Sequence, residues 1–269
     1  TPDSLALSPD GHGGFLKALY ASGAVADMKR RGVEQISYSQ VDNPMVRLID
    51  PLFLGLHATD AAAMSSKMVT KLDPLEKLGN FCLVDGKITV IEYSDLPDDL
   101  ARQRSPDGEL RYCAGSIAVH VIRVDFVELI NTAPGGFALP FHRAEKTVAY
   151  IDLTTGDRQA PTEPNAVKLE SFIFDALPLC PGGPGSIIYQ TRRDEEFAPI
   201  KNADIPGSAD AVDSPATSRQ LQIARSARWL EAHSVRVPHR ADGTVNAAIE
   251  ISHRTAIEPE DLAAVDLPD

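Results

Sequence analysis

Side chains able to bind a ligand stand at several points where a predicted strand gives way to a loop. Glu92 and Tyr93 end the run ITVIEY, and Asp42 follows a predicted strand at 35–41. Loops at strand ends carry much of the binding chemistry of α/β proteins. Glu92 is either an acceptor for sugar hydroxyls or a solvated carboxylate. Asp42 is either a ligand of phosphate-bound Mg²⁺ or a turn and cap residue.

A glycine-rich segment, PDGHGG at 9–14, lies between a predicted strand and a predicted helix. Such a segment either brings the backbone and a helix N-terminus close to a ligand or forms a tight structural turn. Lys168 and Lys201 are candidate phosphate contacts, against the alternative that they are solvated. Phe172 and Phe174 are core residues or stacking surfaces. The seven histidines show no metal-ligand spacing, and a serine nucleophile elbow is absent.

The elements that must position these residues alternate between strand and helix. A strand at 4–8, a helix at 15–31 and a strand at 35–41 predict a βαβ unit with parallel strands. Asp85-Gly86 between two apolar runs predicts a β-hairpin with a type I′ turn. Further helices are expected from Asp50-Pro51 and at 97–104, 126–131, 166–177 and 216–233, with strands at 67–70, 118–124, 148–152, 186–190 and 247–252. The pattern predicts an α/β fold with a mixed sheet.

Composition narrows the classes of function. The formal net charge is −12, which disfavours a non-specific nucleic-acid binder because such proteins carry a basic face. Three widely spaced cysteines indicate a reducing compartment rather than a disulfide framework. We find neither an apolar run long enough to span a membrane nor the apolar core of a signal peptide, so a cytoplasmic protein is expected.

Several motifs, in order along the chain, resemble those of one enzyme family. They are PDGHGG, VDNPMVRLIDPLFLG, LGNFCLVDGKITVIEYSDL, SPDGELRYCAGSIAVH, NAVKLESFIFD and RRDEEFAPIKNAD, with IEISH as a more distant match. Together they are similar to the UDP-N-acetylglucosamine pyrophosphorylase family, the eukaryotic-type UTP:sugar-1-phosphate uridylyltransferases. The match runs from Leu5 to Asp204.

The resemblance implies a Rossmann-like nucleotidyltransferase fold of the GT-A-like kind, with helices on both faces of a mixed sheet. The implied reaction joins UTP and a sugar 1-phosphate to give a UDP-sugar and pyrophosphate. The sugar phosphate attacks the α-phosphorus of UTP in line, and Mg²⁺ and lysines stabilise the developing charge. The implied ligands are UTP, a UDP-sugar, a sugar 1-phosphate and Mg²⁺, with no nucleic acid or membrane. The oligomeric state is not indicated.

Residue by residue, the resemblance places Gly11 and Asp42 on the nucleotide, with Asp42 also the metal ligand. Lys168 falls at a contact with the nucleotide phosphates, and Lys201 at the contact with the sugar phosphate; these two are the implied catalytic residues. The implied sugar pocket contains Gly79, Glu92 and Tyr93, with Phe172 and Phe174 lining its wall.

Two positions of the sugar pocket depart from the family pattern. His12 and Ser116 stand where the family has asparagines of its N-acetylhexosamine pocket. A site built on hydrogen bonds discriminates through them, so the sugar is an N-acetylhexosamine or another hexose or pentose.

A third departure concerns the start of the chain. The family's Gly-rich nucleotide loop is not seen, so we expect a fold incomplete at its N-terminus that is inactive alone. The expected organisation is a catalytic domain at 1–204, then a linker, long helix and C-terminal segment at 205–269.

Two other classes of function remain open. One is a sugar-nucleotide-binding protein of the same fold that has lost catalysis. The other is a glycosyltransferase with the same sheet plan, which the absence of an Asp-x-Asp motif at the Asp42-Asn43-Pro44 strand end disfavours.

Overall fold

The computed structural model describes residues 3–4, 7–137, 139–182, 185–206 and 211–267. The chain divides into two compact units, which we describe separately. Unit 1 is Thr1–Tyr38 with Ile49–Tyr189, and unit 2 is Ser39–Leu48 with Gln190–Asp269.

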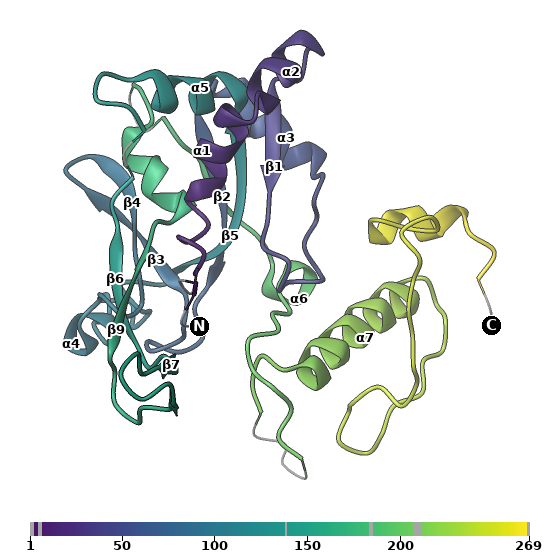
Figure 1. The fold of residues 1–269 in the computed structure, drawn as a ribbon. Coiled ribbons are helices and arrows are strands. Elements are labelled where there is room, and N and C mark those ends of the chain that lie inside the picture. Colours follow the sequence, from purple (N-terminus) through teal and green to yellow (C-terminus); the bar gives the residue numbers. More distant parts are fainter. Residues whose placement is uncertain (1–2, 5–6, 138, 183–184, 207–210, 268–269) are drawn as a thin grey trace. The chain divides into compact units, whose positions relative to one another are not determined.

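Unit 1 is built on a six-stranded sheet in the order β10-β2-β5-β3-β4, with β1 also paired to β5. The strands are β1 (Gln35–Tyr38), β2 (Met64–Thr70), β3 (Gly79–Val84), β4 (Lys87–Ile91), β5 (Ala114–Arg123) and β10 (Ile188–Gln190) (Figure 1). β1, β2 and β3 all run antiparallel to β5. The long strand β5 therefore lies at the centre of the sheet, where it pairs with β1, β2 and β3.

The predicted hairpin is confirmed. β3 and β4 pair antiparallel from Asn80 opposite Ile91 to Val84 opposite Lys87. The two turn residues both take positive φ, 49° at Asp85 and 76° at Gly86. That conformation is the one a type I′ turn requires, and it explains the Asp-Gly pair.

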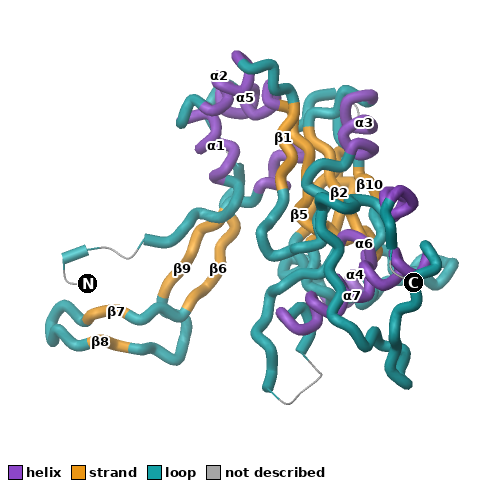
Figure 2. Tube along the Cα trace, turned by 90° about the vertical axis from the view of Figure 1, so that its right-hand side faces the viewer, coloured by secondary structure: helices purple, strands orange, loops and turns teal. Residues whose placement is uncertain are grey.

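Helices cover both faces of the sheet. The helices of unit 1 are α1 (Gly14–Ala21), α2 (Ala24–Arg30), α3 (Pro51–Thr59), α4 (Asp98–Ala101) and α5 (Val124–Thr132). Figure 2 shows α1, α2 and α5 grouped on one side of the sheet and α3 on the other. Leu16 and Phe126 belong to the core cluster between these helices and the sheet. The predicted single helix at 15–31 is two helices, because Gly23 takes a left-handed φ of 81°.

Two small ribbons complete unit 1. β6 (His142–Lys146) pairs with β9 (Ala166–Glu170), and β7 (Tyr150–Ile151) pairs with β8 (Arg158–Gln159). A 3₁₀ helix, η1 (Ile173–Leu179), follows β9 directly. The predicted helix at 166–177 is therefore wrong. Its first residues form a strand because β6 supplies a hydrogen-bonding partner that the local sequence does not reveal.

The predicted parallel βαβ unit is also not found in the described residues. β1 pairs antiparallel with β5. Residues 5 and 6 of the expected first strand lie outside the described part of the chain, and residues 7 and 8 are irregular. The expected strand at 247–252 is irregular as well.

Unit 2 contains α6 (Arg193–Glu196), the long helix α7 (Pro215–Ala232) and the 3₁₀ helix η2 (Pro259–Ala264). Ser214 caps α7 by accepting a hydrogen bond from the Thr217 N–H. Trp229 of α7 packs against Ala256 and Leu262. Within the described residues, no helix is long and apolar enough to cross a membrane.

Candidate active site

The glycine-rich loop lies directly against the backbone at the end of β9. The Gly13 N–H donates to the Ser171 carbonyl at 2.9 Å, and the Ser171 N–H donates to the Asp10 carbonyl at 2.7 Å. Gly11 has a φ of 87°, and a Cβ there would lie 2.3 Å from the Ser171 oxygen. A side chain at Gly11 is therefore excluded by the protein's own backbone. The loop's glycines tie the start of unit 1 to the segment that carries Lys168, Phe172 and Phe174.

His12, at the centre of this loop, sits in a cluster of aromatic rings. Its ring centroid lies 5.1 Å from that of Phe172, 5.7 Å from that of Phe174 and 6.4 Å from that of Tyr38. Its Nδ1 accepts a hydrogen bond from the Ile173 N–H at 3.0 Å. Burial lowers the pKa of His12 to about 4, against a smaller opposing effect of Glu170. The ring is therefore neutral near pH 7, and because Nδ1 is an acceptor, Nε2 carries the proton and is a donor.

Four residues predicted for the sugar pocket, Gly79, Glu92, Tyr93 and Ser116, lie at one end of the β3–β4–β5 sheet. Gly79 pairs with Ser116 across β3 and β5. A Cβ at Gly79 would lie 2.7 Å from Val90, which is too close, and 3.3 Å from the Glu92 carboxylate, so a side chain there would displace Val90 and press against Glu92. Ser116 is buried, whereas Tyr93 is 45% exposed. The structure thus brings Gly79, Glu92 and Ser116 together.

Lys168 lies on β9, on the half-buried face of the β6–β9 ribbon. Its Nζ lies 2.8 Å from the Glu170 carboxylate, two residues along the same strand. Lys168, Phe172 and Phe174 come from one short segment, and the aromatic rings of the last two lie 5.1 Å apart.

The remaining predicted residues, Asp42 and Lys201, belong to unit 2. The Ile200 N–H donates to the Asp42 carbonyl at 2.8 Å, which places Lys201 one residue from this contact. Asn43 fixes the same corner, because its side chain donates to the Glu196 carbonyl and accepts from the Ala198 N–H. Asp42 and Lys201 are therefore held near one another within unit 2.

A metal site of the protein's own would require several coordinating side chains close together. No group of three or more His, Cys, Asp or Glu residues that could hold an ion occurs in the part of the chain that the structure describes. Mg²⁺ commonly keeps several waters and is bound through one or two carboxylates together with substrate phosphates. The single, partly exposed carboxylate of Asp42 fits that manner of binding.

Comparison with known proteins decides the family. Residues 1–205 match the family model described as UTP--glucose-1-phosphate uridylyltransferase. The chain belongs to this family. It is 35% identical over 272 residues to UDP-N-acetylhexosamine pyrophosphorylase-like protein 1 of Mus musculus, covering 97% of this chain and 52% of that protein. It is 33% identical to UDP-N-acetylglucosamine pyrophosphorylase of Saccharomyces cerevisiae, with 97% and 52% covered.

Solved structures give the same assignment for the fold. The chain is similar to a structure described as a putative UDP-N-acetylglucosamine pyrophosphorylase from Entamoeba histolytica, with a TM-score of 0.81 and 28% identity. That alignment covers 97% of this chain and 61% of the solved one. The predicted nucleotidyltransferase-like fold, with helices on a mixed sheet, is therefore confirmed. The chain spans about half the length of the curated relatives it matches.

Several residues of this uridylyltransferase-family chain were missed by sequence reasoning. His142 lies with its Nε2 2.9 Å from the Asp175 carboxylate and its ring 4.6 Å from Phe172. His120, fully buried, lies with its Nδ1 2.7 Å from the Ser66 hydroxyl. Burial is the largest cause lowering the pKa of His120 to about 3. The only sequence signal for His120 was a histidine inside the apolar run VHVIRV.

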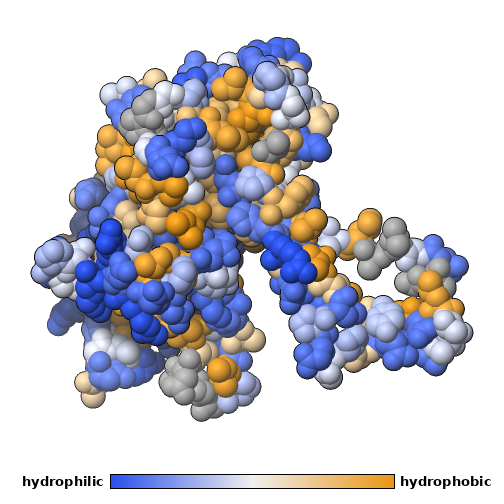
Figure 3. All heavy atoms as spheres, turned by 90° about the vertical axis from the view of Figure 1, so that its left-hand side faces the viewer, coloured by the Kyte–Doolittle hydropathy of each residue, from blue (hydrophilic) through white to orange (hydrophobic). Residues whose placement is uncertain are grey.

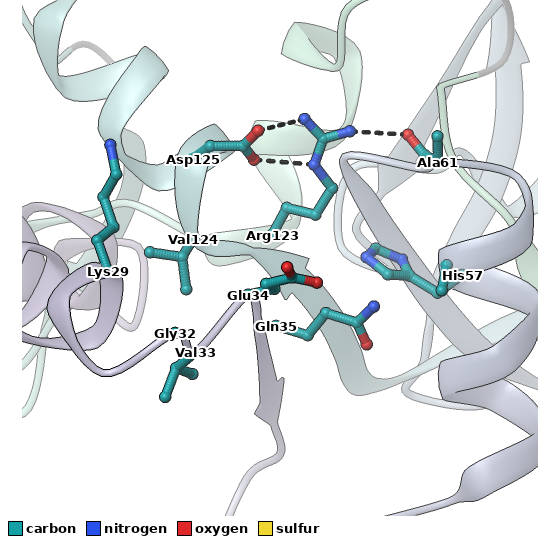
Figure 4. Close-up of a pocket in the computed structure, with 11 residues that line it drawn as sticks. Lys29, Gly32, Val33, Glu34, Gln35, His57, Ala61, Arg123, Val124 and Asp125 are labelled. Atoms are coloured by element: carbon teal, nitrogen blue, oxygen red, sulfur yellow. Dashed lines mark hydrogen bonds and ion pairs between the residues drawn. The ribbon is translucent and has the colours of Figure 1, made fainter.

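A cavity of about 460 Å³ lies elsewhere in unit 1. It adjoins the start of β1 and the end of β5, where Gln35 pairs with Arg123 (Figure 4). Two cationic side chains line the cavity, and both already have partners. Arg123 is hydrogen-bonded to Asp125 and to the Ala61 carbonyl, and Lys29 forms an ion pair with Glu128. None of the predicted site residues lines the cavity. Its lining residues are Lys29, Gly32, Val33, Glu34, Gln35, His57, Ala58, Ala61, Arg123, Val124 and Asp125.

Proposed function

We propose that the encoded protein is a UTP:sugar-1-phosphate uridylyltransferase and that this chain supplies residues for both its sugar site and its nucleotide site. The observation that carries the proposal is the contact of the glycine-rich loop with Ser171. It brings His12 against Phe172 and Phe174 within the residues matched by the family. Relatives named UDP-N-acetylglucosamine pyrophosphorylase and UDP-N-acetylhexosamine pyrophosphorylase-like protein 1 support the reaction class.

The residues have distinct proposed roles. Gly11 and Asp42 contact the nucleotide, and Lys168 contacts its phosphates. Lys201 contacts the phosphate of the sugar, where an ammonium group stabilises charge that develops as the phosphate attacks. Asp42 would hold Mg²⁺, which would supply further positive charge at the phosphates. No side chain is required to form a covalent intermediate.

The sugar is proposed to lie beside Glu92, Ser116 and His12. Glu92 accepts hydrogen bonds from hydroxyl groups, whereas the Nε2–H of His12 donates one. Gly79 leaves the space for Glu92, and Tyr93, Phe172 and Phe174 supply apolar surface. The proposed products are a UDP-N-acetylhexosamine or another UDP-hexose, and pyrophosphate.

Pyrophosphate release tests this function. The encoded protein is incubated with UTP, Mg²⁺ and each of N-acetylglucosamine, N-acetylgalactosamine, glucose, galactose and xylose 1-phosphate. We expect turnover with at least one sugar and loss of turnover when Lys201 is replaced by alanine. Lys77→Ala, at an exposed lysine outside the proposed site, is the matched control. No release with any of these sugars would overturn the proposal.

A sugar-nucleotide-binding protein without catalysis is the second candidate, because His12 and Ser116 replace two side chains of the family pattern. Calorimetric titration of UDP-sugars with and without Mg²⁺ separates the two. Binding that needs no metal, together with no turnover, would favour the second candidate. A cytoplasmic location is also proposed, since Cys82, Cys113 and Cys180 are free thiols.

A further inference from the structure

His142 lies between two segments that the proposed sugar pocket needs but that are far apart in the sequence. One is the loop after β4, which carries Glu92 and Tyr93. The other is the start of η1, which carries Phe172 and Phe174. We infer that His142 is a positioning residue that holds these two segments at the distance a sugar requires. The inference rests on the proposed function and extends it to a residue outside the predicted site.

The contact with the aromatic segment runs through Asp175. The His142 Nε2 lies 2.9 Å from the Asp175 Oδ2, and the Phe172 N–H donates to the same oxygen at 3.2 Å. Asp175 is largely buried, and burial is the main cause raising the pKa of its carboxyl group. The His142 hydrogen bond opposes that effect and favours the ionised form. One carboxylate oxygen thus joins His142 to the backbone of Phe172.

The imidazole also contacts the aromatic segment directly. Its centroid lies 4.6 Å from that of Phe172, whose other neighbours are His12 at 5.1 Å and Phe174 at 5.1 Å. Removing the imidazole would leave the Phe172 ring without one of its three described ring contacts. The orientation of Phe172 therefore depends on His142 through both a hydrogen bond and packing.

The contact with the sugar loop runs through Asp95. The His142 Nδ1 lies 3.8 Å from the Asp95 Oδ2. The Asp95 N–H in turn donates to the Glu92 carbonyl at 3.0 Å. This ion-pair distance is longer than the contact with Asp175, so it contributes less, but it reaches the turn on which Glu92 and Tyr93 stand.

The position of His142 on its ribbon separates its role from that of Lys168. His142 pairs with Glu170 across β6 and β9, and Lys168 pairs with Ala144. These pairings fix Lys168 through backbone hydrogen bonds, which do not involve the imidazole. A change at His142 should therefore weaken recognition of the sugar more than recognition of the nucleotide phosphates.

The test compares UDP with UDP-sugars in calorimetric titrations of the encoded protein. We expect His142→Ala to weaken UDP-glucose and UDP-N-acetylglucosamine binding about tenfold, while UDP binding changes less than about threefold, in keeping with the loss of one hydrogen bond and one ring contact. His142→Gln places a side-chain N–H near Asp175 without the ring, so part of the loss should be recovered. Arg143→Ala changes the next residue, on the exposed face of the same ribbon, and should leave both ligands unaffected.

The outcomes separate the inference from the proposed function. Equal weakening of UDP and UDP-sugars in His142→Ala, or no weakening of either, would overturn the positioning role and leave the uridylyltransferase proposal standing. Wild-type protein that binds neither ligand would overturn both. If His142→Ala does not fold, the same titrations are made with Asp95→Asn, which changes the exposed partner of His142. A selective loss of about threefold for UDP-sugars supports the inference, and no selective loss overturns it.

Discussion

His12 shows how one side chain can alter what a pocket recognises. An asparagine offers both a donor and an acceptor, and the family pattern has asparagine at this position. Here the Ile173 N–H occupies Nδ1, which leaves Nε2–H as a donor alone. With a pKa lowered to about 4 by burial, His12 keeps this character throughout the physiological range. A sugar oxygen suits this donor, but the acetamido N–H finds no acceptor on His12.

The first prediction concerns sugar preference. Replacing His12 and Ser116 together by asparagine should raise the ratio of kcat/KM for N-acetylglucosamine 1-phosphate over glucose 1-phosphate by about tenfold or more, since polar groups left unpaired in a site dominate its discrimination. Steady-state pyrophosphate release with the two sugars measures the ratio. Ser94→Asn, on the exposed loop after Glu92, serves as the control and should leave it unchanged. An unchanged ratio in the double variant would remove His12 and Ser116 from sugar recognition.

At the scale of elements, the local sequence correctly predicts the β3–β4 hairpin and the start of helix α3. Asp85-Gly86 encodes its own turn. Asp50 also caps α3 as its position before Pro51 predicts, with its carboxylate accepting from the Leu52 and Phe53 N–H groups. Both features depend on neighbours within three residues.

Strand pairings and side-chain contacts between residues far apart in the sequence were not predicted. The segment 166–170 has apolar residues compatible with a helix, yet it pairs with β6 and leaves Val167 and Leu169 exposed. Figure 3 shows apolar side chains among polar ones on the surface of the protein. His142 reaches its partners Asp95 and Asp175 across 47 and 33 positions of sequence, so spacing carries no trace of the contact. The family resemblance supplied most of the candidate site, but it could not supply these pairings.

The second prediction tests the glycine-rich loop. Gly11 and Gly32 both take left-handed φ values, 87° and 70°, but a Cβ at Gly32 meets open space whereas one at Gly11 meets the Ser171 carbonyl. Gly32→Ala should therefore lower the free energy of unfolding by about 1 kcal/mol, which is the cost of holding alanine at a positive φ. Gly11→Ala should cost at least about 2 kcal/mol more because the loop must move away from Ser171. Urea unfolding of both variants measures this difference. Equal costs would mean that the loop shifts freely and is not fixed by Ser171.

The third prediction concerns the buried ion pair beneath α3. The Lys67 Nζ lies 2.6 Å from the Asp50 carboxylate, and the Lys67 side chain is fully buried against Phe53 and Tyr189. Asp50→Ala removes the cap and leaves a buried charge, so it should cost about 3–5 kcal/mol.

A second substitution should recover much of that loss. Adding Lys67→Met to Asp50→Ala removes the buried charge that has lost its Asp50 partner, and thermal and urea unfolding should show a double variant more stable than the single one. Asp60→Ala, at the exposed end of the same helix, should change stability by less than about 0.5 kcal/mol. A double variant no more stable than Asp50→Ala would show that the buried charge is not the main cost.

At the scale of the molecule, an acidic surface contrasts with an interior that contains neutral histidines. The formal net charge is −12, yet three imidazoles in unit 1 are held uncharged. Burial, their largest cause, lowers the pKa of His12 and His57 to about 4 and that of His120 to about 3. The His57 and His120 Nε2 atoms have no hydrogen-bond partner within the described structure, so protonation there would leave an unpaired buried charge.

The fourth prediction follows from this difference between the folded and unfolded states. Unfolded histidines bind protons near pH 6.5, whereas these three do so near pH 3–4, so the unfolded state holds more protons between those limits. The contribution of these histidines to the stability of unit 1 is therefore fully present above about pH 6.5. It is lost as the pH falls toward 4, by about 1 kcal/mol or more for each histidine.

His57→Asn keeps a polar contact for Ser65 but cannot titrate, so its urea-unfolding free energy should fall less steeply between pH 7 and 5. His239, exposed, has its pKa raised by hydrogen bonds to Gly243 and Glu231, so its contribution has the opposite sign and is lost as pH rises. His239→Asn should therefore not flatten the acid limb. Identical slopes for the wild type and His57→Asn would show that His57 binds a proton as readily in the folded protein as in the unfolded one, and water must then reach its buried Nε2.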